Sequence, residues 1–524
     1  MAFGKLMSNY VSASVALSFA GFLNGYDTGS IGGIAHMDQF AASLGPLSAS
    51  TLGMTVSIIM LTGALPALFA GRLADKRGRL GVVMPGALLF ALGSLLQATS
   101  STLAQFVTGR AVSGVGQGAF LGNVSVYIAE VAPARRRGRL AALPQFMAAL
   151  GVCVGYFCCF GTAGVGGSLA WRLPYVVPVA VSLGLALVCG YLPESPRWLV
   201  TQPGRAEDAR AALELLDFDM REAERDILSA PPPSRGEEGG TAGLSHRQSL
   251  ALLFRRGYRS RTFLALFVLT MVQLSGIDAI TYYAPSLFSQ AGVSSSTSSL
   301  VASGVASITM LAVSIPAFLL ADKWGRRSST ISGGLALAAL MFLVGGLYAA
   351  GAVRPDSGAA RWVVIVCVFL FGMVFCATWG IVGKIYASEI QPGDTRAAGN
   401  ALGMSFSFLS NFFVALVTPV LLAASAFGAY FLFGALALVT VAVLTVSMPE
   451  TRGRSLEDIQ SDFRRPATNA LSGLLRLPGV RRRNASSTND ASTQGTELEP
   501  VEGQALASSV SVEVAARGLR VGAA

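Results

Sequence analysis

Stretches without any charged side chain dominate the chain. The longest of them, residues 397–449, contains no Asp, Glu, Lys or Arg over 53 residues. A helix that spans a lipid bilayer needs about 20 mostly apolar residues, so this run has room for two. Soluble globular enzymes lack such runs, and the strands of outer-membrane barrels are segments of ~10 residues with alternating polarity. The pattern therefore predicts an all-α membrane protein. Seven further runs of this kind are 39–71, 80–109, 111–129, 140–171, 173–193, 279–321 and 328–353.

The apolar runs and the polar loops between them predict twelve spanning helices. Their expected limits are 11–34, 51–71, 81–99, 103–131, 140–162, 173–192, 262–290, 298–321, 328–350, 362–389, 397–422 and 427–448.

The segment between the sixth and seventh helices differs from the rest. Residues 194–261 carry 22 of the 68 charges, and residues 204–228 show helical periodicity with a charged face. We expect one or two short surface helices there, followed by a flexible linker. The tail is rich in Ser, Thr and mixed charge, which is typical of disorder. The expected organisation is a six-helix bundle (1–192), a cytoplasmic helical linker (193–261), a second six-helix bundle (262–448) and a cytoplasmic tail (449–524), mostly disordered after about residue 465.

Basic residues in the short loops predict the orientation. The loops after the second, fourth and eighth helices contain three or four Lys or Arg each, whereas those after the third, seventh and eleventh contain none. Cytoplasmic loops are enriched in these residues, so both termini and the linker are expected on the cytoplasmic side. No small-residue cleavage site closes the first apolar stretch, which favours a spanning helix over a removed signal peptide. We expect a multi-pass protein of the plasma membrane.

Composition narrows the function further. Charged residues make up 13% of the chain, against about 25% in soluble proteins. The net charge of +10 would suit a nucleic-acid partner, but basic cytoplasmic loops explain it, so none is expected. All six cysteines fall in apolar runs, where we expect them to be packing residues. No phosphate-binding loop or cluster of metal ligands is present, which predicts no cofactor, no metal and no enzymatic activity.

Three pairs of motifs recur at offsets of 247 to 259 residues. Arg72–Arg79 matches Leu320–Arg326, each of two glutamates has an arginine seven residues on, and Pro-Glu pairs follow the sixth and twelfth helices. The repetition predicts a duplicated six-helix unit, as in transporters. We expect the repeated charged residues to brace the outward-facing state and to separate when the halves rock. They are Asp75, Arg79, Glu130, Arg137 and Glu194 in the first half, and Asp322, Arg326, Glu389, Arg396 and Glu450 in the second.

Few ionisable residues lie away from helix ends, and in a membrane such residues are usually functional. Asp27 lies ~24 Å along the first helix and Arg110 ~10 Å below the outer end of the fourth, so their depths nearly coincide. We expect an ion pair. Asp27 would take up and lose a proton as Arg110 approaches and withdraws, because a nearby cation favours the charged carboxylate. The alternative is a permanent structural salt bridge.

The seventh helix also carries polar residues. Gln273, Asp278, Tyr282 and Tyr283 would line one face and hydrogen-bond a polar ligand, or would hold helices together. Lys384 would either snorkel to the interface, face a ligand or pair with Asp278.

These motifs resemble those of the sugar porters of the major facilitator superfamily, most closely the fungal-type members. The likeness covers about residues 15–460 and rests on five motifs: Gly25–Gly29, Gly109-Arg110 with Gly114 and Gly116, Pro193–Trp198, Gln273–Tyr283 and Pro449–Arg454. It implies the major facilitator fold, with twelve helices in two pseudo-symmetric bundles around a central sugar site. In proton-coupled members the residues at positions 27 and 110 form the coupling pair. Gln145, Gln273 and Tyr282 match sugar-contacting positions.

The central pocket departs from the family pattern. Asp278 stands where the family has Asn, Lys384 where it has Trp, and Ser407 where it has Asn or Gln. Val272, Asn24 and Ile381 also differ. An introduced Lys and Asp would form a new ion pair or recognise a charged or unusual polyol. With Ser407 and Asn411 of the eleventh helix, the candidate lining is complete.

The expected function is uptake of a monosaccharide or similar polyhydroxylated solute by alternating access. We expect proton symport, a monomeric functional unit, and the solute, the proton and the lipid bilayer as partners. The alternatives are a carrier or exporter of a sugar acid or secondary metabolite, a facilitative uniporter and a non-transporting sugar sensor.

Overall fold

The computed structural model describes residues 9–133, 136–218, 220, 224, 246–293, 295–320, 325–354, 358–391 and 393–451. All of them belong to the first of two compact units, Met1–Leu474. The second unit, Leu475–Ala524, lies outside the described residues, as do most of the predicted tail and residues 225–245 of the predicted linker.

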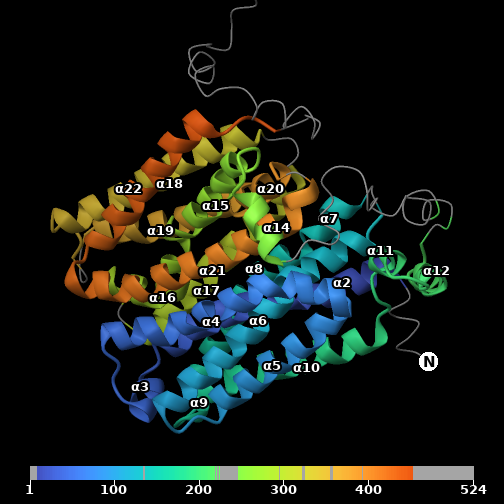
Figure 1. The fold of residues 1–524 in the computed structure, drawn as a ribbon. Helices are drawn as coiled ribbons and strands as arrows, with labels where there is room; N and C mark the ends of the chain where they lie inside the picture. The colour runs from blue at the N-terminus through green and yellow to red at the C-terminus, as the bar shows by residue number, and fades with distance from the viewer. Residues whose placement is uncertain are drawn as a thin grey trace, which may run out of the picture. The chain divides into compact units, whose positions relative to one another are not determined.

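The described residues are almost entirely helical (Figure 1). The helices of the first half are α2 (Tyr10–Ile34), α3 (Asp38–Leu44), α4 (Ala49–Arg77), α5 (Leu80–Ala98), α6 (Leu103–Val131), α7 (Arg137–Ala141), α8 (Leu143–Ala163), α9 (Leu169–Arg172), η1 (Leu173–Tyr175) and α10 (Val176–Tyr191). Those of the second half are α15 (Arg259–Gln273), α16 (Ile277–Gln290), α17 (Ser296–Leu320), α18 (Arg326–Ala349), α19 (Ala360–Ala377), α20 (Trp379–Glu389), α21 (Gly393–Ala424) and α22 (Gly428–Ser447).

Ten spans in the described part of the chain are long and apolar enough to cross a membrane. The helices α2 and α6 are also long enough, with 25 and 29 residues, but their most apolar stretches are less apolar than those of the ten. They contain Asp27, Arg110 and many small residues, which lower their mean hydropathy. Together these segments make the twelve predicted spanning helices. Large apolar side chains such as Leu65 and Leu187 are exposed on the outer surface, as expected of surface that faces lipid.

The seventh and tenth spans are each broken, although the sequence predicted single helices over 262–290 and 362–389. Gly276 has a φ of +91°, a left-handed conformation that favours glycine, and it separates α15 from α16. Thr378, with φ −123° and ψ −80°, separates α19 from α20. Both spans remain apolar on average, so mean hydropathy gives no sign of the breaks. The break at Gly276 places the end of α15 and the start of α16 beside the polar residues Gln273 and Asp278.

Glycines bring α2 and α8 into backbone contact. A Cβ atom at Gly25 would overlap the carbonyl of Ala148 and lie 2.8 Å from its Cα, and Gly21 and Gly29 face Pro144 and Val152 in the same way. This four-residue spacing of small residues lets membrane helices approach closely. The contact fixes α2, and therefore Asp27, against the fifth span.

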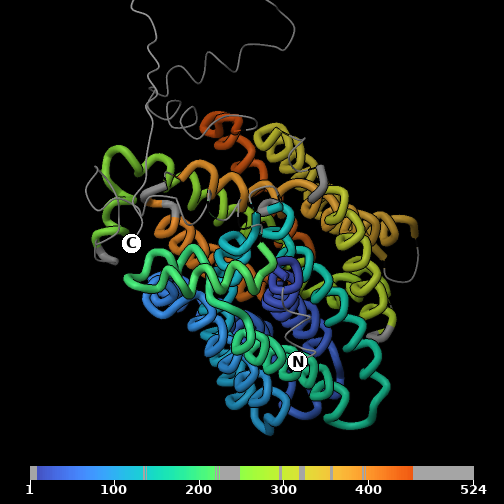
Figure 2. The backbone as a smooth tube through the Cα atoms, turned by 90° about the vertical axis from the view of Figure 1, so that its right-hand side faces the viewer, coloured from blue at the N-terminus to red at the C-terminus, as the bar shows by residue number. Residues whose placement is uncertain are grey.

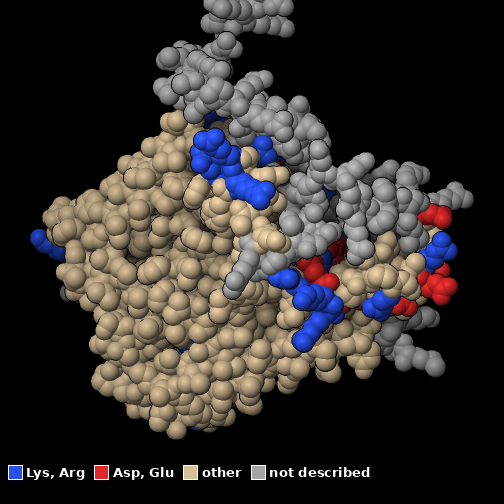
Figure 3. All heavy atoms as spheres, viewed as in Figure 1, with Lys and Arg blue, Asp and Glu red and all other residues tan. Residues whose placement is uncertain are grey.

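Short helices follow the sixth span. These are α11 (Pro196–Thr201) and α12 (Ala206–Leu215), followed by α14 (His246–Leu253). The Trp198 indole donates to the Asp75 carbonyl at 2.8 Å, and the Tyr10 amide donates to the Leu216 carbonyl at 3.0 Å, so α11 and α12 are attached to the first half. Figure 2 shows this green segment beside the blue helices of that half. On the face drawn in Figure 3, charged side chains gather toward α12 and α14, and most other surface is uncharged.

Candidate functional site

Asp27 and Arg110 form a buried ion pair within the first half. The Nη1 and Nη2 atoms of Arg110 donate to the two carboxylate oxygens of Asp27 at 3.1 and 3.3 Å. Nη2 also donates to the Val56 carbonyl at 2.8 Å. The Arg110 side chain is 0% exposed and that of Asp27 6%. Sequence depth therefore predicted the pair correctly, and its two-point geometry is a strong, directional form of this interaction.

A second polar pair lies beside it and was missed by the sequence analysis. Gln117, two helical turns after Arg110, donates to the side chain of Asn24, one turn before Asp27. Gln117 is fully buried. Its Oε1 has no hydrogen-bond partner among the described residues. A polar amide within the charge-free run 111–129 was the available signal.

Asp278 lies in a polar cluster of the second half, directly after the break at Gly276. Gln273 Nε2 donates to its carboxylate at 3.0 Å, and the Asn411 side chain also hydrogen-bonds it. Asn411 is buried, and its Oδ1 has no partner in the described part of the chain. The break thus brings Gln273 and Asp278 together from two separate helices. An open amide oxygen beside them suits a hydroxyl donor from a ligand.

Lys384 reaches across to the other half of the chain. Its Nζ donates to Gln145 Oε1 at 2.7 Å, which joins α20 to α8. The sequence offered Asp278 as its partner, and the two do interact electrostatically, but the hydrogen bond goes to Gln145. Both Lys384 and Gln145 are solvent-exposed. A side chain bonded to the opposite half does not snorkel toward lipid, so it faces the space between the halves.

The remaining candidates take different places. Tyr282 is buried and interacts electrostatically with Asp27, Arg110 and Asp278, so it links the ion pair to the Asp278 cluster. Tyr283 instead donates its hydroxyl to the Ala415 carbonyl at 2.6 Å and is a packing contact in the second half. Ser407 is partly buried on α21, one turn before Asn411.

The two halves meet closely at the end opposite to Lys384. Tyr156 of α8 donates its hydroxyl to the Thr281 carbonyl of α16. A Cβ atom at Gly32 would lie 2.5 Å from the Tyr282 carbonyl oxygen of α16, and one at Gly53 would overlap the Leu416 carbonyl of α21. Helix backbones are therefore in near contact there, and the site is closed on that side.

Charged residues gather at the ends of the helices nearest Lys384, which we call the charged end. Arg79 bonds Asp75 and, at 3.0 Å, Glu130. Glu194 accepts the amide of Arg79 at 2.9 Å and that of Leu80 at 3.1 Å, which caps α5. Burial alone would lower the pKa of Arg79, but its hydrogen bonds and charge pairing with Glu130 and Asp75 raise it above the ordinary value.

The second half repeats this cluster. Arg326 pairs with Glu389 at 3.3 Å. Glu450 accepts the amides of Arg326 and Arg327 at 2.8 and 3.1 Å, as Glu194 does at α5. The repeat found in the sequence thus corresponds to equivalent contacts. Asp322 and the side chains of Arg137 and Arg396 lie outside the described residues.

Glu194→Ala is expected to destabilise the first half. The change removes two charge-assisted hydrogen bonds to the N-terminus of α5, and loss of a helix cap costs about 1–2 kcal/mol. Thermal unfolding in detergent should show a lower midpoint, and Glu450→Ala should have a similar effect. Glu214→Ala, at an exposed position on α12, is the control. An unchanged midpoint for both cap variants would contradict the proposed capping role.

A family model described as "Sugar (and other) transporter" matches residues 13–463. The chain belongs to this family. The glucose transporter GlcP of Staphylococcus epidermidis is 30% identical over 454 residues, which covers 85% of this chain and 96% of GlcP. The high-affinity glucose transporter 1 of Candida albicans is 28% identical over 475 residues, covering 87% and 86%.

Solved structures agree with this family assignment at the level of the fold. The xylose transporter XylE from E. coli, in a partially occluded inward open conformation, superposes with a TM-score of 0.70 at 22% identity, over 85% of this chain and 99% of XylE. This sugar transporter family member is accordingly a multi-pass membrane protein of the major facilitator fold. It is a transporter and not an enzyme.

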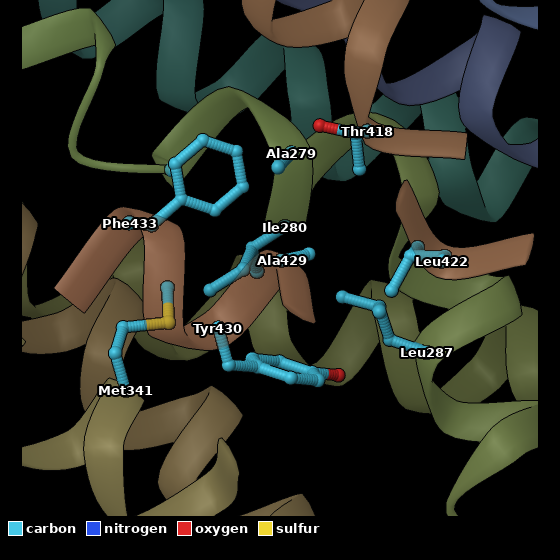
Figure 4. Close-up of a pocket in the computed structure, with 10 residues that line it drawn as sticks. Ala279, Ile280, Leu287, Met341, Thr418, Leu422, Ala429, Tyr430 and Phe433 are labelled. Carbon is cyan, nitrogen blue, oxygen red and sulfur yellow. The ribbon is translucent and has the colours of Figure 1, made fainter. Parts of the chain in front are cut away.

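An apolar pocket in the second half is separate from the polar site. Its lining in Figure 4 includes Ile280, Leu287, Met341 and Phe433, with Thr418 and the Tyr430 ring at its edge. Such a lining offers a polyhydroxylated solute almost no hydrogen-bonding groups. We therefore place the candidate site at the polar cluster and the ion pair.

Proposed function

We propose that this family member carries a monosaccharide or a similar polyhydroxylated solute by alternating access, coupled to a proton on Asp27. The buried Asp27–Arg110 pair is the observation that carries the proposal. Two charges in the membrane interior are costly and are retained mainly where they work. One solved structural neighbour is described as a proton:xylose symporter, and the relative GlcP as a glucose transporter.

A proton on Asp27 would cancel the charge that holds Arg110. The Arg110 guanidinium keeps its bond to the Val56 carbonyl, while its two bonds to Asp27 weaken. The pair would therefore differ between the loaded and the empty carrier. A difference of this kind is what a proton needs in order to shift the equilibrium between two states.

The solute would bind beside this pair, between the halves. In this proposal the lining residues are Gln145, Gln273, Asp278, Tyr282, Tyr283, Lys384, Ser407 and Asn411. The two charged clusters would stabilise one arrangement of the halves and yield in the other. We further propose a monomeric unit in the plasma membrane with both termini cytoplasmic.

Uptake into proteoliposomes tests the proposal. Purified protein would be given labelled D-glucose and D-xylose, with an inwardly directed pH gradient and with or without a protonophore. We expect accumulation that the protonophore abolishes. Flux that ignores the gradient would indicate a facilitative uniporter instead. Absence of flux for every solute tested would favour a non-transporting sensor and contradict the proposal.

A further inference from the structure

We propose that the transported solute bears a carboxylate in addition to its hydroxyl groups, and that Lys384 recognises this carboxylate. The inference rests on the proposed transport function and names the class of its substrate. The Lys384 ammonium group lies between the two halves, bonded to Gln145 of the first half.

The Lys384 ammonium has hydrogen-bonding capacity to spare. An ammonium carries three N–H donors, and Gln145 Oε1, a neutral acceptor 2.7 Å away, is its hydrogen-bond partner among the described residues. Protein atoms surround the side chain, yet it keeps solvent-accessible surface. A cation placed in this way can accept a further ligand from the central space.

Asp278 does not neutralise this cation by direct contact. The two charges interact electrostatically, but no ion pair within 4.0 Å joins them in the part of the chain that the structure describes. The Asp278 carboxylate is instead bonded by Gln273 at 3.0 Å and by Asn411. Asp278 is thus partly satisfied by neutral donors, whereas Lys384 is left facing a neutral amide.

The surrounding groups indicate what completes the site. Asp278 and the open Oδ1 of Asn411 are acceptors, and acceptors suit the hydroxyls of a polyol. Lys384 suits an anion, because hydrogen bonds between charged groups are about twice as strong as neutral ones. Among the described residues, Lys384 is bonded to an amide and has no arginine bonded beside it, and one such ammonium fits a monoanionic carboxylate better than a phosphate ester, which favours the guanidinium fork. A polyhydroxylated carboxylic acid matches both ends.

Binding of such an acid would also act on the two halves. The carboxylate would accept a hydrogen bond from Lys384 Nζ in competition with Gln145, and the Lys384–Gln145 bond is a direct bridge between α20 and α8. The ligand would therefore loosen one contact at the charged end as it binds. A differential contact of this kind is what couples occupancy to a conformational change.

Uptake of matched solutes tests the inference. Labelled D-glucuronate and D-gluconate would be compared with D-glucose in proteoliposomes containing wild type, Lys384→Gln, Lys384→Arg or Lys76→Gln. Lys76, an exposed lysine at the end of α4, is the matched control for loss of one positive charge. We expect Lys384→Gln to reduce uptake of the acids by at least tenfold, and to reduce it far more than it reduces uptake of glucose. Lys384→Arg should retain much of the acid uptake, and Lys76→Gln all of it.

The charge that crosses the membrane provides a second readout. A monoanion carried with one proton moves no net charge, whereas a neutral sugar with one proton moves one positive charge. Uptake of the acids should therefore be unaffected by a potassium diffusion potential set with valinomycin. Uptake of the acids that responds strongly to this potential would contradict the inference.

Two outcomes separate this inference from the function on which it depends. Wild-type protein that carries glucose and excludes both acids would overturn the inference and leave the proposed function intact. Protein that is correctly folded by size-exclusion chromatography and carries none of the solutes would overturn both.

Discussion

Asp27→Asn is expected to abolish accumulation of solute against a gradient. Asparagine keeps an oxygen that can accept from Arg110, but it cannot take up and release a proton. One unit of pH gradient is worth about 1.4 kcal/mol per proton, which corresponds to tenfold accumulation of solute. In proteoliposomes with such a gradient, the variant should therefore reach only equal concentrations on both sides, and the wild type about tenfold.

Exchange of solute between the two sides should persist in this variant. Exchange needs the halves to move with solute bound, and it does not need net release of a proton. Asp38→Asn changes an exposed carboxylate on α3 and should accumulate solute like the wild type. If Asp27→Asn still accumulated solute tenfold, the pair with Arg110 would be a structural salt bridge, which is the alternative that the sequence left open.

Gly25→Ala is expected to destabilise the protein, although alanine favours helix. In an open helical position this change stabilises by up to about 1 kcal/mol. At Gly25 the added Cβ would overlap the carbonyl of Ala148, and backbone atoms cannot rotate away as a side chain does. Overpacking of this kind costs about 1–3 kcal/mol. The net change should lower the thermal midpoint in detergent and weaken transport, because α2 carries Asp27.

Gly161→Ala is the matched control. Gly161 lies on α8, and nothing stands within 4 Å of an added Cβ. The same substitution there should leave the midpoint equal or slightly higher. Opposite signs for the two variants would assign the effect to the close α2–α8 contact. Equal shifts would show that the contact relaxes at little cost.

The sequence predicted what depends on one helix at a time. Apolar runs and the polar loops between them identified the twelve spans because a helix that crosses the bilayer needs about 20 mostly apolar residues. The depths of Asp27 and Arg110 predicted their pairing because both lie on unbroken helices with a constant rise per residue. The repeat predicted the likeness of Glu194 and Glu450, because a duplicated helix end needs the same cap.

Contacts between the two halves were not accessible in this way, and some features within one half were also missed. Nothing in the spacing of Gln145 and Lys384 sets their separation, because it depends on how the halves pack. The breaks at Gly276 and Thr378 were missed because each whole span remains apolar on average. The Asn24–Gln117 pair was missed because neither residue carries a charge.

The two halves repeat one pattern of motifs but differ in the continuity of their equivalent spans. The first and fourth spans, α2 and α6, are continuous, while their counterparts in the second half are each divided in two. The first half, with helices in backbone contact through glycine, can move as a rigid body through the transport cycle. The second half has two helix breaks, at Gly276 and Thr378, that can serve as hinges. Its short segments α16 and α20 can tilt about these breaks without unfolding a full span. Inhibitors that bind beside these helix breaks would block the conformational change of the carrier without competing for its solute.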